Sequence, residues 1–248
     1  MEKKYGTKWS EEETILAFYY YCQIPFGKIH TSNPEIIRIA TLLGRTPGSV
    51  SRKMGNLGHF DPELQSRNIS GLSNASKTDA EVVQRFFGNW EELSFLAKRI
   101  EAGLVADAGD HFPAGLENEQ MIRARVHQDF FRAAVLSSYS QRCCITGIDV
   151  PTLLNASHIK PWAVSDPRTE RTNPRNGLCL NVLHDRAFDK GLITVQPDFT
   201  VRVSSKLTAG NDGMEWLLLC DHQKISLPQR FIPQREFLEY HNDVIFIA

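Results

Sequence analysis

The sequence lacks a long hydrophobic run, an excess of charge of one sign and any C-x-x-C motif. Its 248 residues hold 28 basic and 29 acidic side chains, for a net charge of −1. No apolar stretch approaches the roughly 18 residues of a membrane span, and the opening MEKKYGTKWSEEE has no apolar signal-peptide core. We therefore expect a cytoplasmic protein with no membrane partner.

Cysteine is sparse, and its spacing is atypical of both disulfide frameworks and zinc knuckles. The five cysteines are odd in number, and two of them are adjacent. This usage favours a reducing compartment. We expect Cys143, Cys144 and Cys179 to be small buried side chains, and we expect no structural zinc.

The balance of charge conceals two regions of opposite sign. From Glu101 to Asp129 there are six acidic residues and two arginines, a net of −4, whereas Ile36 to Phe60 holds four cations and no acid. The acidic region contains a stretch rich in glycine, residues 103–120, which is the best candidate for a linker. We therefore predict a helical DNA-recognition domain at 1–102, a linker at 103–120 and a second domain at 121–248.

Capping signals divide the N-terminal domain into helices. Ser10 with Glu13 forms a capping box before an apolar stripe. A second helix should begin at Asn33-Pro34 and end at Gly44, and a third should begin at once after Thr46. Two more are expected near 78–87 and 90–102, the last ending at Gly103.

The second and third of these helices have the layout of a helix-turn-helix. In the third, apolar residues at positions 50, 54 and 57 would face the core. Another face carries side chains suited to phosphates and base edges, namely Ser49, Arg52, Lys53 and Asn56. A solvated basic face would show the same pattern, so both interpretations stay open.

The C-terminal domain mixes helices and strands, so the fold class is α+β. A helix is expected over 118–139, followed by the strand TLLNASHI, a polar loop, the strand GLCL and the helix NVLHDRAFDKG. The segment LITVQPDFTVRVS alternates apolar and polar residues around Pro197-Asp198, which predicts a hairpin.

Three polar residues stand at the corners of this strand, loop, strand and helix unit. His158 ends the first strand, Asn176 precedes the second, and His184 lies in the first turns of the helix. With its surrounding motifs RCCITG, NASHIKPW and NGLCLNVLHDRAFDKG, the stretch from Arg142 resembles the HNH (ββα-metal) endonucleases, particularly the McrA-like, modification-dependent restriction nucleases.

The resemblance implies hydrolysis of DNA phosphodiesters to 5′-phosphate and 3′-hydroxyl ends. His158 would be the general base, because neutral imidazole has a suitable pKa. His184 would hold a divalent metal, and the amide of Asn176 would tie the loop and orient the base. Many relatives have a metal ligand just before the base, but this chain has Ser157, so we assign the second ligand to Asp149. Oxygen donors and few histidines favour Mg²⁺ or Mn²⁺.

Other residues of the unit receive simpler interpretations. We expect Trp162, Leu183 and Phe188 in the core, whereas Asp189 either caps the helix end or binds the metal. Three loop arginines either contact DNA phosphates or are merely solvated: Arg168, Arg171 and Arg175.

The function predicted is a metal-dependent DNA endonuclease of a restriction or phage-defence system. Its partner would be double-stranded DNA, cut at a specific sequence or at a modified cytosine. One cleaving centre per chain favours a homodimer. The alternative is a DNA-binding regulator in which the nuclease-like domain is only a scaffold.

Overall fold

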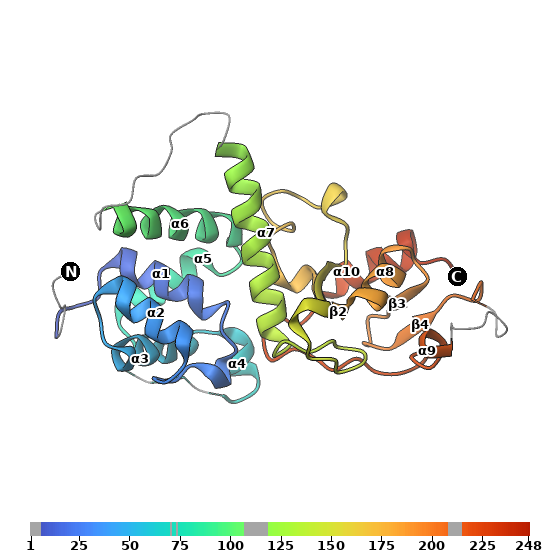
Figure 1. Cartoon of the computed structure of the whole chain (residues 1–248), viewed down its shortest axis with the longest axis horizontal. Coiled ribbons are helices and arrows are strands. Elements are labelled where there is room, and N and C mark those ends of the chain that lie inside the picture. The colour runs from blue at the N-terminus through green and yellow to red at the C-terminus, as the bar shows by residue number, and fades with distance from the viewer. Residues whose placement is uncertain (1–5, 70, 73, 107–118, 208–214) are drawn as a thin grey trace. The chain divides into compact units, whose positions relative to one another are not determined.

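The computed structural model describes residues 6–69, 71–72, 74–106, 119–207 and 215–248 (Figure 1). The chain divides into two compact units, Met1–Phe130 and Phe131–Ala248. In the described residues, no helix is both long and apolar enough to cross a membrane.

Unit 1 is helical. Its elements are α1 (Glu11–Tyr21), a 3₁₀ turn (Phe26–Lys28), α2 (Pro34–Leu43), α3 (Pro47–Gly58), α4 (Pro62–Ser66), α5 (Lys77–Phe86), α6 (Trp90–Ala106) and the first part of α7 (Glu119–Ser138). Helix α1 packs against α3, α5 and α6, and its side chains from Ile15 to Tyr21 are all buried. The core of unit 1 therefore surrounds α1.

Local capping sets the first three helices where the sequence predicts them. Ser10 and Glu13 form the expected capping box on α1. The side chain of Asn33 caps α2, and Gly44 ends it in the left-handed conformation with φ of 64°. The Thr46 hydroxyl caps α3, and Val50, Met54 and Leu57 are fully buried. The predicted core face of α3 is confirmed.

Helix α6 is longer than predicted. It continues through Gly103 to Ala106, so the expected stop at Gly103 is wrong. A single glycine costs a helix only about 1 kcal/mol relative to alanine, and the next three residues, Leu104 to Ala106, continue the helix and include no proline. Most of the predicted linker, residues 107–118, lies outside the described residues, and its last two residues belong to α7. The border between the compact units falls later, within α7.

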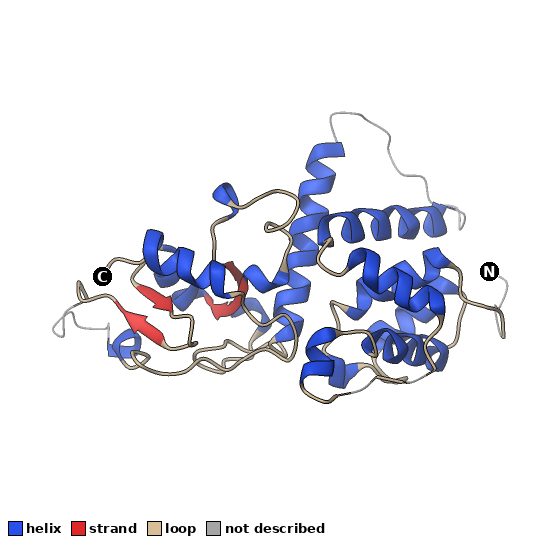
Figure 2. Cartoon of the chain, turned by 180° about the vertical axis from the view of Figure 1, so that it is seen from behind, coloured by secondary structure: helices blue, strands red, loops and turns tan. Residues whose placement is uncertain are grey.

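Unit 2 is built around two small antiparallel sheets (Figure 2). Strand β1 (Leu154–His158) pairs with β2 (Gly177–Asn181), so that His158 lies opposite Gly177. Helix α8 (Val182–Asp189) follows directly, and β3 (Ile193–Val195) pairs with β4 (Val201–Val203) as the predicted hairpin. Short turns precede β1 and β2, at Pro151–Leu153, Trp162–Val164 and Pro174–Asn176, and α9 (Glu215–Leu218), α10 (Arg235–Tyr240) and a π-helix (His241–Ile245) complete the unit. Helices with small sheets confirm the α+β class.

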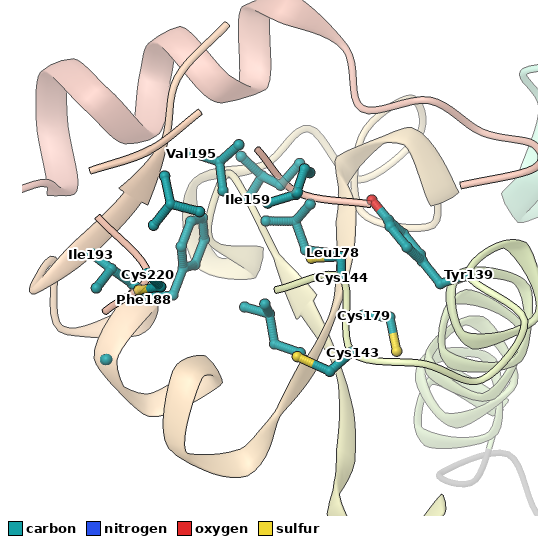
Figure 3. Close-up of a cluster of buried hydrophobic side chains, with 14 of the residues drawn as sticks. Tyr139, Cys143, Cys144, Ile159, Leu178, Cys179, Phe188, Ile193, Val195 and Cys220 are labelled. Carbon is teal, nitrogen blue, oxygen red and sulfur yellow. The ribbon is translucent and has the colours of Figure 1, made fainter. Parts of the chain in front are cut away.

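The core of unit 2 contains four of the five cysteines (Figure 3). Cys143, Cys144 and Cys179 are free and buried, as expected of small apolar side chains. Phe188 is also fully buried, whereas Trp162 is only half-buried, so its predicted core position is wrong. The core position predicted for Leu183 is wrong too, because this side chain is 58% exposed. The neighbouring side chain in α8, that of His184, is buried instead and is only 2% exposed.

Candidate active site

A cavity of about 540 Å³ opens on unit 2 beside the end of β1. Strand β1 and the turn after it form one wall, α8 another, and the remainder comes from α7 and from the C-terminal π-helix. Its lining includes His158, Asn155, Asp185, Asp189, Arg132 and His241.

His158 is held with one ring nitrogen ready to accept a proton. Its Nε2 lies 2.9 Å from the backbone oxygen of Arg171. Because a carbonyl oxygen only accepts, Nε2 carries the hydrogen, and the neutral tautomer leaves the Nδ1 lone pair unprotonated. The ring stacks on Phe131, with centroids 3.8 Å apart and planes 10° apart. Burial lowers the pKa of His158 below its usual 6.5, so the neutral form prevails at neutral pH.

Asn176 ties down the loop that follows His158. The side chain is fully buried, and its Oδ1 accepts from the backbone N–H of Lys160 at 2.8 Å. Its Nδ2 donates to the Lys160 oxygen at 3.1 Å and to the Ser165 hydroxyl at 3.3 Å. One amide thus closes both ends of the turn beyond His158, the arrangement that the sequence assigns to it.

The two predicted metal ligands lie elsewhere. His184 does not line the cavity: its Nδ1 lies 3.1 Å from Asn181 Oδ1, and its ring packs edge-on against Trp216. Burial lowers the pKa of His184, and its Nε2 is buried with no hydrogen-bond partner among the described residues. Asp149 is more than half exposed and pairs with Arg142 at 2.8 Å. Neither side chain lines the cavity that holds His158.

Two carboxylates of α8 lie in the cavity instead. Asp185 and Asp189 are one helical turn apart and both line it. The side-chain amide of Asn155 donates to Asp185 Oδ2 at 2.7 Å, which orients that carboxylate. Burial and, second, the charge of Asp185 raise the pKa of Asp189, as expected for neighbouring acids. No cluster of three His, Cys, Asp or Glu side chains that could hold a metal occurs in the described part of the chain. In the sequence, this carboxylate pair is recognisable from the i, i+4 spacing of the two aspartates.

Cations line the same cavity. Arg132, from α7, donates from Nη2 to the Leu154 backbone oxygen at 2.8 Å, which fixes it beside the start of β1. Arg186 of α8 and Lys190, directly after the helix, are both exposed. Positive side chains beside a base and a carboxylate pair suit a phosphodiester, whose own charge is negative.

The loop arginines differ in their environment. The guanidinium of Arg171 donates to the backbone oxygens of Trp162 and Ser165, both at 3.1 Å, so it shapes the loop. Arg175 is half-buried, and Arg168 is exposed. Of the three, Arg168 is the most accessible to a phosphate.

The four side chains of the predicted recognition face of α3 also differ in their environment. Ser49, Arg52, Lys53 and Asn56 all line a cavity of about 560 Å³, together with Lys8, Trp9 and the start of α5. Lys53, however, is only 5% exposed and pairs with Asp79 at 2.5 Å, so it faces the protein rather than solvent. The Asn56 amide donates to the backbone oxygen of Asn74 at 3.2 Å, whereas Arg52 is exposed.

The comparisons with known proteins concern only part of unit 2. Residues 143–196 match the family model of an HNH endonuclease. No curated protein matches the chain. The matched stretch includes His158, Asn176 and the aspartates of α8, but not Arg132 or His241. The chain therefore carries an HNH endonuclease domain at residues 143–196.

Proposed function

We propose that the protein is a DNA endonuclease that depends on a divalent metal and uses His158 as its general base. The observation that carries the proposal is the hydrogen bond from His158 to the Arg171 backbone oxygen, because it leaves Nδ1 unprotonated in a cavity that also holds two carboxylates. Nδ1 would take a proton from a water molecule as the water oxygen forms a bond to phosphorus. The bond from phosphorus to the 3′ oxygen then breaks, and a proton from solvent completes the 3′-hydroxyl.

The donor set in the cavity fits a hard cation. Asp185 and Asp189 present carboxylate oxygens, which Mg²⁺ and Mn²⁺ prefer. We assign them the ligand role in place of His184 and Asp149, which lie outside the cavity. A bound cation would stabilise the charge that develops on the phosphate and on the leaving oxygen.

Unit 1 would select the DNA. The helix-turn-helix-like pair α2 and α3 presents Ser49, Arg52 and Asn56 beside Lys8, and these polar and cationic side chains suit a DNA backbone and base edges. Lys53 would support this surface from below through its pair with Asp79. A homodimer would bring two cleaving centres to the two strands of a symmetric site.

The biological setting that we propose is restriction or phage defence in the cytoplasm, directed at a specific sequence or at a modified cytosine. This setting rests on the resemblance to McrA-like nucleases around His158. The rival function is a DNA-binding regulator, and the position of His184 outside the cavity is the observation in its favour.

A plasmid-nicking assay separates the two. Wild-type protein, His158→Ala and the control His30→Ala, an exposed histidine of unit 1, are incubated with Mg²⁺ or Mn²⁺. Matched plasmids carry no modification, 5-methylcytosine, 5-hydroxymethylcytosine or phosphorothioate. We expect cleavage by wild type and His30→Ala only. Equal cutting by His158→Ala, or no cutting of any plasmid by the wild type, contradicts the proposal.

A further inference from the structure

The cavity depends on residues beyond the segment that matches the HNH family. That match ends at residue 196, yet His241 and Ile245 also line the cavity. They belong to a π-helix, His241–Ile245, the only π-helix among the described residues. Such wide turns are rare and often occur at functional sites. The C-terminal segment, residues 241–247, therefore calls for a physical explanation.

His241 binds both α8 and the strand after it. It is 1% exposed, its Nε2 lies 3.2 Å from the Phe188 backbone oxygen, and its Nδ1 lies 2.8 Å from the Thr194 hydroxyl. Since the carbonyl only accepts, Nε2–H donates to Phe188 and Nδ1 accepts from Thr194. The ring also stacks on Phe188, with centroids 3.7 Å apart. Phe188 immediately precedes Asp189, so His241 holds the backbone next to that carboxylate.

Gly191 allows the C-terminal segment to pack closely against the end of α8. Its φ is +66°, and a Cβ at this position would lie 2.1 Å from the Ile245 backbone oxygen. The Ile247 N–H donates to the Gly191 oxygen at 2.9 Å. The Asn242 side chain donates to the Val195 oxygen at 2.8 Å. The segment is thus hydrogen-bonded on both sides of the turn that follows Asp189.

We propose that residues 241–247 act as a brace that fixes α8 within the cavity, with His241 as a positioning residue for Asp189. Groups that orient metal ligands commonly contribute 10- to 100-fold to metal affinity. The consequence for a cation rests on the proposed function, whereas the bracing of α8 does not.

A glycine pair tests the brace. Gly191→Ala places a methyl group on the Ile245 oxygen, whereas at the control Gly147→Ala, with φ of +74°, nothing lies within 4 Å of the added carbon. Both variants carry the strain of a left-handed alanine, but only Gly191→Ala displaces the segment. Because Gly191 also closes α8 through its N–H to the Phe188 oxygen, His241→Leu, which leaves that turn intact, is measured beside it. Amide hydrogen exchange of α8 is measured in metal-free, full-length protein. We expect faster exchange in Gly191→Ala than in Gly147→Ala. Equal exchange in the two variants overturns the proposal.

Mn²⁺ binding, followed by the electron paramagnetic resonance of the free ion, tests the link to the carboxylates. His241→Leu removes both hydrogen bonds, and His241→Gln can restore a donor and an acceptor. At a temperature where all variants are folded, we expect Mn²⁺ affinity to fall about tenfold or more in His241→Leu and to recover in part in His241→Gln. Unchanged affinity in His241→Leu contradicts the positioning role. If the wild type binds no Mn²⁺, the metal site of the proposed function is wrong, and hydrogen exchange alone decides the brace.

Discussion

Charged side chains are paired under the α3 face of unit 1 but not around the cavity of unit 2. In unit 1, Lys53 pairs with Asp79 and Arg45 pairs with Glu13, and each side chain is at most 7% exposed. Both cations also lie over the ring of Trp9, at 4.9 and 4.3 Å from its centroid. These charges are committed to holding the fold.

Around the unit 2 cavity the charges remain available. Among the described residues, none of Asp185, Asp189, Arg132, Arg186 and Lys190 forms an ion pair within 4.0 Å. Burial and the charge of Asp185 disfavour the ionised form of Asp189, and a bound cation would relieve both effects. The difference indicates that the charges around the unit 2 cavity are available to bind a ligand. In unit 1 the buried charges stabilise the fold, and exposed cations such as Arg52 remain available.

Removing the carboxylates should have the largest effect. In the double variant Asp185→Asn, Asp189→Asn the cavity loses both anionic donors, and a cation is worth several kcal/mol in such a reaction, so we expect cleavage to fall on the order of 10³-fold. Nicking rates against Mn²⁺ concentration measure it. The control Asp149→Asn, at the exposed pair with Arg142, should keep wild-type cleavage. The reverse outcome would return the metal site to Asp149.

Lys53→Met should destabilise unit 1 rather than weaken its DNA contacts. Removing one member of a buried ion pair leaves the other uncompensated, here Asp79, at a cost of about 3–5 kcal/mol. Urea unfolding measures the change, with Lys77→Met as the control because the Lys77 side chain is 91% exposed. A loss below 1 kcal/mol would show that the α3 pair is not structural.

The same two regions show what a sequence can predict. The bounds of α2 and α3 follow from caps at Asn33 and Thr46, which act within a few residues. The sequence points to His158 and Asn176 through the SHIKPW and NGL motifs, which resemble those of HNH endonucleases. Lys53 was misplaced because its partner Asp79 lies 26 residues away in sequence.

The face of α8 that packs inward differs from the one that the sequence predicts. The sequence favours Leu183 in the core, but the helix buries His184 against Trp216, from a segment about 30 residues further along. That packing leaves Asp185 and Asp189 on the cavity that His158 also lines. Because α8 has only eight residues, its apolar pattern alone does not determine which face packs inward. The contact with Trp216 determines it.

The pH dependence of cleavage should follow the buried imidazole. Nδ1 must be unprotonated to act, and burial lowers the pKa of His158 below 6.5. As pH falls, the midpoint of the decline in rate should therefore lie below pH 6.5, and the rate should then fall about tenfold per pH unit. Single-turnover rates at saturating Mg²⁺ measure this limb. A midpoint at or above pH 6.5 would mean that the base is not in this buried setting.

Arg52→Ala should have the smallest effect, and it tests whether the exposed face of α3 contacts DNA. Arg52 is exposed and, in the described part of unit 1, forms no ion pair, so it can release one counterion from a phosphate. Binding of His158→Ala protein to duplex DNA is measured by fluorescence anisotropy at several salt concentrations. Adding Arg52→Ala should weaken binding to all sequences and reduce the logarithmic salt slope by about one. The control Lys28→Ala, an exposed cation outside that cavity, should leave the slope unchanged. An equal slope for Arg52→Ala and Lys28→Ala would mean that unit 1 does not read DNA through α3.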